Sequence, residues 1–261
     1  HLVDVRRSLS YLYQHGPEQS GDCRQRIERV AESVDEACTL HPALSVSSIL
    51  LMHDAAYLVK HAVDAAILAN LLAREMKLDD AARHAIVAAA LTMNIGMCEV
   101  QEKVDAIPGK LNDKLVTMIH HHPERGAERL IRLGVTDSAW LDCVRQHHEN
   151  IDGSGYPTGL AGDAIDIGAR IVGVADRYCA MVSRRAYRGP LKPNLALRDL
   201  CVKQGRCIDV TVAATLIRIV GIYPVGTLVR LKSSEIGVVT GPVYCTKIAS
   251  RLTRTYTDRH S

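Results

Sequence analysis

The sequence contains no phenylalanine and one tryptophan, and its net charge is only +3. These features limit which residues can form the core and which classes of partner the chain can have. Without phenylalanine, the core has to be filled by leucine, isoleucine, valine, alanine and methionine. The small net charge argues against nucleic acid as the main partner. No apolar run approaches the roughly 18 to 20 residues that cross a bilayer, and the start at His1 shows no signal-peptide pattern, so we expect no membrane partner.

Closely spaced cysteine pairs are absent as well. None of the eight cysteines forms a CxxC pair, and most lie among residues with helical periodicity. Such cysteines are typical of reduced, small apolar side chains and not of a disulfide framework. With 47% apolar and 23% charged residues, the composition is that of an ordinary globular protein. We therefore expect a cytoplasmic protein with reduced thiols.

The spacing of apolar residues predicts a mainly helical chain. Helices are expected over 22–36 (exposed and amphipathic), 46–76, 81–92, 112–122, 138–149, 168–184, 192–204 and 209–220, and Pro123 is expected to open another. Two short β-prone runs, 227–231 and 236–240, surround a polar turn and predict a hairpin. The expected fold class is all-α with a small C-terminal β-hairpin. We expect the chain to divide into an N-terminal helical segment (1–45), a main domain (46–220) and a hairpin tail (221–261).

Several histidines fall on separate segments that helical packing can bring together. They are His61, His122, His147 and His148, and Asp176 lies on a later helix. Neutral imidazole suits iron, manganese or zinc, and a carboxylate supplies the anionic oxygen that such sites need. Taken one at a time, a histidine is more often an ordinary polar side chain. Two further histidines, His120 and His121, have no special claim.

A longer motif gives this set of histidines a context. The run from His147 to Pro157 reads His-His-Glu-Asn-Ile-Asp-Gly-Ser-Gly-Tyr-Pro and resembles the HHExxDGxGYP signature of the HD-GYP family. His122-Pro123 with Gly126 resembles the HPxxG helix start of that family, and Asp176 followed by Arg185, Tyr187 and Arg188 is similar to its closing segment. The resemblance covers roughly residues 46–220. It implies an HD-domain-like helical bundle with a GYP loop and extra C-terminal helices.

Resemblance to this family also implies a chemistry. Its members hold two or three iron or manganese ions and hydrolyse cyclic di-GMP to pGpG or GMP, because adjacent metals clamp the attacking hydroxide and the leaving oxygen. The metal ligands implied here are His61, His122, His147, His148 and Asp176. Arg185 and Arg188 are expected to contact ligand phosphates, which a guanidinium matches with two parallel donors. Gly155, Tyr156 and Pro157 are expected to shape the ligand loop.

The chain departs from the family at the pair that bridges the metals. Where the family has His-Asp-Ile-Gly, this sequence reads Met93-Asn94-Ile95-Gly96. A thioether is a soft ligand that suits iron and manganese poorly, and a neutral amide cannot offset two divalent cations as a shared carboxylate does. The residue four before His61 is Tyr57, which offers no carboxylate for a third metal. We therefore expect one iron, manganese or zinc ion and no full bimetallic centre.

Three functions stay open on the sequence alone. The favoured one is a non-hydrolytic domain in cyclic di-GMP signalling that binds a cyclic dinucleotide or a protein partner such as another signalling domain. The alternative is a weakly active, metal-dependent cyclic di-GMP phosphodiesterase with a reduced metal site. The third is a dimerisation or interaction scaffold, for example one that forms a homodimer. The retained histidines argue against a pure scaffold, because buried imidazoles without a ligand are costly in a core.

Overall fold

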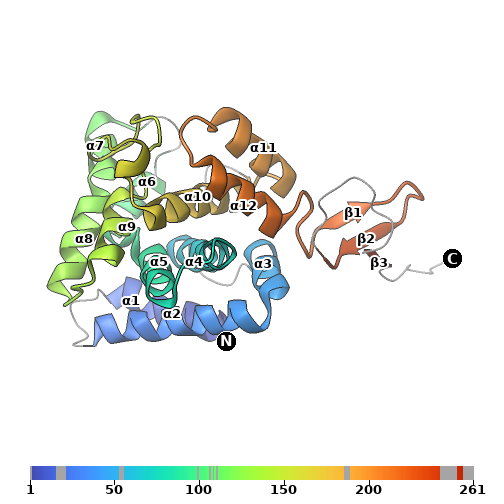
Figure 1. Cartoon of the computed structure of the whole chain (residues 1–261), viewed down its shortest axis with the longest axis horizontal. Coiled ribbons are helices and arrows are strands. Elements are labelled where there is room, and N and C mark those ends of the chain that lie inside the picture. The colour runs from blue at the N-terminus through green and yellow to red at the C-terminus, as the bar shows by residue number, and fades with distance from the viewer. Residues whose placement is uncertain are drawn as a thin grey trace.

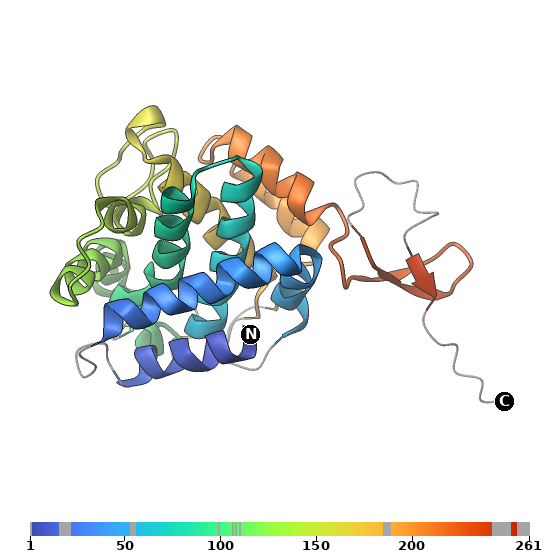
Figure 2. The same cartoon turned by 60° about the horizontal axis from the view of Figure 1, so that its bottom comes forward.

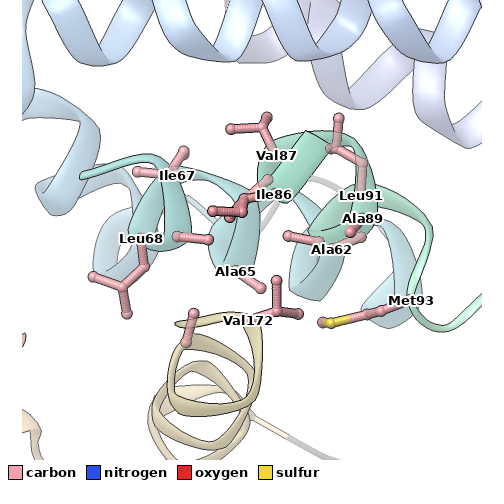
Figure 3. Packing of buried hydrophobic residues seen from close by; sticks show 14 of the residues in the cluster. Ala62, Ala65, Ile67, Leu68, Ile86, Val87, Ala89, Leu91, Met93 and Val172 are labelled. Atoms are coloured by element: carbon pink, nitrogen blue, oxygen red, sulfur yellow. The ribbon is translucent and has the colours of Figure 1, made fainter. Parts of the chain in front are cut away.

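The helix α4 (Tyr57–Glu75) lies at the centre of the molecule and is buried on all sides from Val59 to Ala73. Other elements enclose this helix, and its buried polar residues, among them Lys60 and Asp64, have partners inside the protein. Its many alanines, among them Ala62 and Ala65, let α5 (Asp80–Thr92) and α10 (Ile167–Val182) pack closely against it (Figure 3). Most of the rest of the core is leucine, isoleucine, valine and methionine, as the lack of phenylalanine predicted, with Trp140, Tyr178 and several cysteines among them.

The structure is a computed structural model and describes residues 2–15, 22–52, 56–98, 100–105, 107, 109, 111–184, 189–241 and 252–254. Its other helices are α1 (Leu2–His15), α2 (Cys23–Leu40), α3 (Pro42–Leu51), α6 (Gln101–Asp105), α7 (Asp113–His120), α8 (His122–Arg132), α9 (Ser138–Gln146), α11 (Pro193–Lys203) and α12 (Val210–Val220), with short 3-10 turns η2 (Ile95–Met97) and η3 (Gly162–Ala164) (Figure 1). The mainly helical class is confirmed. Within these described residues, no helix combines the length and apolarity needed to cross a bilayer.

The two N-terminal helices pack onto the same core. The buried face of α2 consists of Cys23, Ile27, Val30, Ala31, Val34 and Cys38, and it lies against α4 and α5 (Figure 2). The helix expected over 22–36 is therefore amphipathic as predicted, with one face exposed, and its other face is buried against the core. Helix α1 is tied to α4 by a buried ion pair in which Arg6 Nη2 lies 3.1 Å from Asp64 Oδ1.

The stretch 46–76, expected as at least one unbroken helix, contains parts of two. Helix α3 ends at Leu51, Met52 is extended, and α4 begins at Tyr57, although no glycine or proline marks the break. The Lys60 ammonium on α4 donates to the carbonyl oxygen of Ile49 at 2.9 Å. That carbonyl lies in the last turn of α3, where no partner exists within the helix. A tertiary contact thus stabilises a helix end that the local sequence does not signal.

Side-chain caps fix where two helices next to the site begin. Asp79 accepts a hydrogen bond from the backbone N–H of Ala82 at 2.8 Å at the start of α5. Asn112 accepts one from the N–H of Leu115 at 2.9 Å at the start of α7. Such caps satisfy donors that the first turn leaves without partners. Helix α5 leads directly to residues 93–94, and α7 leads to the histidines at 120–122.

A small antiparallel sheet follows α12. Strands β1 (Leu228–Arg230) and β2 (Ile236–Val239) pair with Leu228 opposite Val238, which confirms the expected hairpin. A third strand, β3 (Leu252–Arg254), pairs with the other edge of β2 and was not predicted. Both views place this sheet beyond α12, at one end of the helical body (Figures 1 and 2).

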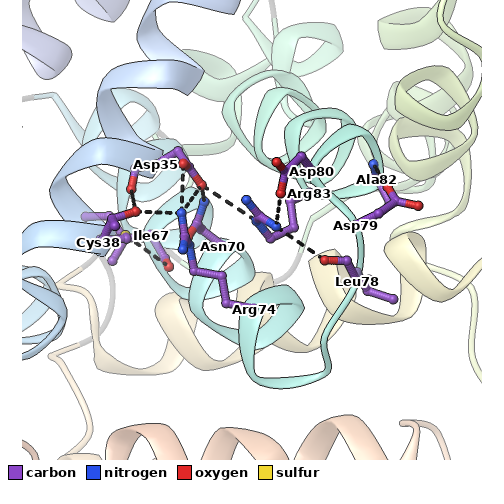
Figure 4. A network of polar contacts seen from close by, with 11 residues as sticks. Asp35, Cys38, Ile67, Asn70, Arg74, Leu78, Asp79, Asp80, Ala82 and Arg83 are labelled. Atoms are coloured by element: carbon purple, nitrogen blue, oxygen red, sulfur yellow. Dashed lines mark hydrogen bonds and ion pairs between the residues drawn. The ribbon is translucent and has the colours of Figure 1, made fainter.

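A polar network joins α2, α4 and α5 on one side of the core (Figure 4). Asp35 accepts hydrogen bonds from Asn70 Nδ2 at 2.7 Å and from Arg74 Nη2 at 2.8 Å. Arg83 of α5 lies 3.8 Å from the same carboxylate. Burial alone would raise the pKa of Asp35, but the hydrogen bonds from Asn70 and Arg74 outweigh it and hold this pKa below its usual value.

We predict that replacing Asp35 with asparagine lowers the free energy of unfolding at pH 6, and that this loss becomes smaller as the pH falls below about 4. A carboxylate with a lowered pKa in the folded state contributes its full stabilisation above the pKa of the unfolded chain, about 3.9, and loses it as the pH falls through the folded-state pKa. Urea unfolding of the wild type and Asp35→Asn across this range measures the difference. A gap between the two proteins that stays constant with pH would contradict the ion-pair role of Asp35.

Candidate metal centre

Three imidazoles meet where α8 begins and α9 ends. His122 is the first residue of α8, and His147 and His148 directly follow the last residue of α9. One ligand nitrogen from each lies within 4.8 Å of the others. His122 and His147 are 2% and 1% exposed, and His148 is partly buried. The structure thus gathers His122, His147 and His148, called the imidazole trio below.

Hydrogen bonds to helix ends set the orientation of two of these rings. His122 Nδ1 lies 2.7 Å from the carbonyl oxygen of Ile119, and His147 Nδ1 lies 2.7 Å from that of Val144. A carbonyl oxygen only accepts, so we assign the ring proton to Nδ1 in both histidines. Each Nε2 is then a bare lone pair, and the two Nε2 atoms face each other at 3.3 Å.

The pocket keeps these imidazoles neutral. Burial, reinforced by the neighbouring His147, lowers the pKa of His122 to about 3. Burial likewise lowers the pKa of His147 and of His148. At neutral pH neither Nε2 atom therefore carries a proton, which would turn the contact between the two lone pairs into a hydrogen bond. A bound cation would relieve this contact, and neutral imidazole nitrogens held by carbonyl partners are a common donor set for first-row metals. The trio fits one such ion.

The other two predicted ligands contact each other. His61 of α4 and Asp176 of α10 are both buried, and His61 Nε2 lies 2.7 Å from Asp176 Oδ1. Burial would raise the pKa of Asp176, but the hydrogen bond from His61 outweighs it and holds this pKa far below its usual value. The His61 ring also stacks on Tyr57, with centroids 5.3 Å apart. His61 and Asp176 thus lie beside the trio as a hydrogen-bonded pair.

Residues 93 and 94 contribute no charged ligand. Met93 is fully buried, and its side chain lies among the apolar residues of α4, α5 and α10 (Figure 3). Asn94 is partly exposed and precedes η2. Gly96, two residues after Asn94, packs against the start of α8, because a Cβ on Gly96 would come within 2.2 Å of the carbonyl oxygen of His122. At residue 94 the chain has an amide in place of the carboxylate that would bridge two metals.

The loop after the trio is anchored by a buried carboxylate. Glu149 Oε1 accepts hydrogen bonds from the N–H and the hydroxyl of Thr158, each at 2.7 Å, and from the N–H of Gly159 at 3.2 Å. The loop also folds back tightly, since a Cβ on Gly155 would lie 2.3 Å from the backbone nitrogen of Asn150. Glycine is required at such a close approach.

This anchoring places the predicted ligand-loop residues beside the trio. The Tyr156 ring stacks on His148, with centroids 4.7 Å apart and planes at 28°. Gly155 and Pro157 flank it in the chain. Burial raises the pKa of the Tyr156 hydroxyl, so it is a hydrogen-bond donor at neutral pH. The other two predicted ligand contacts, Arg185 and Arg188, lie outside the described residues.

Two residues of the site were missed by sequence reasoning. Arg177 follows Asp176 on α10 and donates through Nη2 to Asn150 Oδ1 at 2.5 Å, in the loop that carries Tyr156. Its place next to a predicted ligand was the signal that could have found it. His120 stacks on Tyr156 with centroids 4.4 Å apart. No feature of the sequence separates His120 from its neighbour His121.

Comparison with known proteins shows which family this chain belongs to. A family model described as HD domain matches residues 45–212. The chain belongs to the HD domain family. A solved structure, Bd1817, an HDG"Y"P protein from Bdellovibrio bacteriovorus, superposes with a TM-score of 0.67 over 82% of this chain and 68% of its own, at 16% identity. That likeness concerns the fold, and it agrees with the HD-GYP resemblance of the sequence.

Several relatives are named as cyclic dinucleotide phosphodiesterases. The cyclic di-GMP phosphodiesterase PA4108 of Pseudomonas aeruginosa is 34% identical over 210 residues, which are 80% of this chain and 50% of PA4108. The cyclic di-GMP phosphodiesterase response regulator RpfG of Xanthomonas campestris is 35% identical over 157 residues, 58% of this chain and 40% of RpfG. The 3′3′-cGAMP-specific phosphodiesterase 1 of Vibrio cholerae is 33% identical over 135 residues, 52% of this chain and 31% of that enzyme. The HD domain chain thus spans half or less of the length of these relatives.

We predict that the HD domain chain, purified untagged and without chelators, binds one equivalent of manganese, iron or zinc and that His147→Ala loses it. The buried His147 nitrogen cannot be replaced by water in the same geometry, so affinity should fall at least about tenfold. Elemental analysis and calorimetric titration with each metal measure this. His121→Ala is the matched control, because His121 is exposed and pairs with Glu124. Two tightly bound equivalents in the wild type would contradict the single-ion interpretation.

Proposed function

We propose that this HD domain acts in cyclic dinucleotide signalling by binding cyclic di-GMP, or a close analogue, at the imidazole trio without two-metal hydrolysis. The ligand class rests on the relatives, which are named cyclic di-GMP and 3′3′-cGAMP phosphodiesterases. The lack of hydrolysis rests on one observation. Met93, at the position where the family has its metal-binding histidine, is buried in the hydrophobic core.

Charge balance supports a single ion. Two divalent cations roughly 3.5 to 4 Å apart need an anion between them to offset their repulsion. Among the side chains expected as ligands, one carboxylate is present, Asp176, and it already accepts a hydrogen bond from His61. The trio itself is neutral, and Asn94 adds no charge. The negative charge of one carboxylate is enough for a single ion held by His122, His147 and His148 but not for two.

The surroundings of the trio suit an anionic ligand. A metal ion there would supply positive charge for a phosphate of the dinucleotide. Arg177 adds a positive charge near His147 and His148, whose pKa values it helps to lower, and its hydrogen bond ties it to Asn150 in the loop of the trio. Because a guanidinium has five N–H donors, one bond to Asn150 leaves several for phosphate oxygens. Arg185 and Arg188, predicted phosphate contacts, would strengthen the same preference.

A weakly active phosphodiesterase is the second candidate, and the comparisons favour it over the first. The curated relatives described above carry phosphodiesterase names, and this chain has the two histidines of the HD-GYP signature, His147 and His148. A single ion can lower the pKa of a bound water and so supply a hydroxide nucleophile. Without a second ion, the leaving oxygen has no metal partner, so hydrolysis would be slow. Binding of a protein partner or of a second copy stays a prediction.

The deciding experiment adds back the missing anion. Asn94→Asp is isosteric and partly exposed, so it restores the carboxylate without disturbing the core. The double variant Met93→His/Asn94→Asp restores the full pair. We expect the wild type to bind cyclic di-GMP in calorimetry and to release no pGpG, Asn94→Asp to gain affinity for a second manganese or iron ion, and the double variant to gain pGpG release.

Three outcomes separate the candidates. Metal-dependent pGpG release by the wild type that is lost in His147→Ala would establish the weak phosphodiesterase. An absence of cyclic di-GMP binding would reject the ligand proposal and leave a scaffold role. If both restored variants fold, as judged by circular dichroism, but gain neither metal nor activity, the bridging pair is not what separates this chain from its active relatives.

A further inference from the structure

The third imidazole of the trio is held differently from the other two. His122 and His147 are each oriented by an Nδ1 bond to a backbone carbonyl. The His148 ring makes no hydrogen bond with any described residue. It is instead packed between two other rings, with its centroid 4.1 Å from that of His147 and 4.7 Å from that of Tyr156. Ring stacking therefore takes the place of the hydrogen bond that normally fixes a metal-binding imidazole.

The outer face of Tyr156 is covered by His120. The two ring centroids are 4.4 Å apart and the planes differ by 16°, which is a close parallel stack. Tyr156 is thus enclosed between His120 on one side and His148 on the other. Offset stacked rings attract beyond the area that they bury, so His120 restrains Tyr156 and, through it, His148.

The junction between α7 and α8 makes this restraint rigid. His120 is the last residue of α7 and His122 the first of α8, and the carbonyl of Ile119 holds the His122 ring. One short turn thus positions both a member of the trio and the outermost ring of the stack. The intervening His121 is 58% exposed and bonds through Nδ1 to Glu124 Oε2 at 2.9 Å, away from Tyr156.

We propose that His120 is a positioning residue for the metal centre, which clamps Tyr156 onto His148 and so presents the third ligand. This assignment rests on the proposed metal binding by the trio. The imidazole of His120 acts through its flat ring and not as a ligand. Its side chain is exposed, so its loss opens no cavity in the core and should leave the overall stability nearly unchanged.

The test compares His120→Ala, His120→Phe and His121→Ala with the wild type. Calorimetric titration with zinc or manganese should give an affinity about two- to tenfold lower for His120→Ala, the range that one aromatic pair contributes. His120→Phe should restore it, because phenylalanine keeps the stack but cannot bind a metal. His121→Ala should match the wild type, and thermal unfolding should be similar for all four proteins.

A second measurement needs no metal. Diethyl pyrocarbonate acylates accessible imidazole nitrogens, and mass spectrometry of the peptide that contains His148 reports its rate. In metal-free protein, His120→Ala should speed this acylation severalfold, and His120→Phe and His121→Ala should not. If the wild type binds no metal, the proposed metal centre fails, but the acylation rate still decides the role of His120. Equal His148 reactivity in His120→Ala and the wild type, or no rescue by phenylalanine, would overturn the assignment.

Discussion

Two buried imidazole nitrogens face each other across 3.3 Å, and this contact between lone pairs is the constraint on which the site depends. Both rings are fixed by carbonyls in the last turn of a helix, that of Ile119 in α7 and that of Val144 in α9. Such carbonyls have no partner within their own helix and are free to accept from a side chain. Helix ends thus impose an arrangement that the rings alone would avoid, and a bound cation would make it favourable.

The change at residues 93 and 94 alters packing as well as charge. Burying a methionine side chain contributes about 1.5 to 3 kcal/mol, whereas a buried histidine needs polar partners. Met93 therefore anchors the end of α5 in the core without any metal. On the other side of the site, Asp176 has His61 as its partner. Both contacts stabilise the helical body without a bound metal ion.

The features that depend on local sequence could be predicted. Asp79 precedes the helix expected over 81–92 and caps its start, and the long signature places His147, His148 and Tyr156 in one segment, where Tyr156 stacks on His148. Features set by tertiary contacts were not foreseen. The end of α3 depends on Lys60 from the next helix, and the burial of α2 depends on what packs against it.

The same limit applies within the site itself. His120 and His121 are adjacent and chemically identical, and the helix end alone decides which of them meets Tyr156. Likewise, His61 and Asp176 have the residue types of metal ligands, but the sequence does not say that they bond to each other. Residue types in a motif therefore indicate the kind of site, whereas the partners of each side chain come from packing.

The support of the site extends beyond the segment that matches the family. The match begins at residue 45, yet α1 contacts the structure next to two site positions. Arg6 pairs with Asp64, one turn after His61 on α4, and the Tyr13 hydroxyl donates to the carbonyl oxygen of Leu91 at 3.0 Å, two residues before Met93. A buried carboxylate that loses one of its cations is costly, so removal of α1 would strain α4 where it carries His61. The N-terminal helices are therefore part of the framework that sets the geometry of the metal centre.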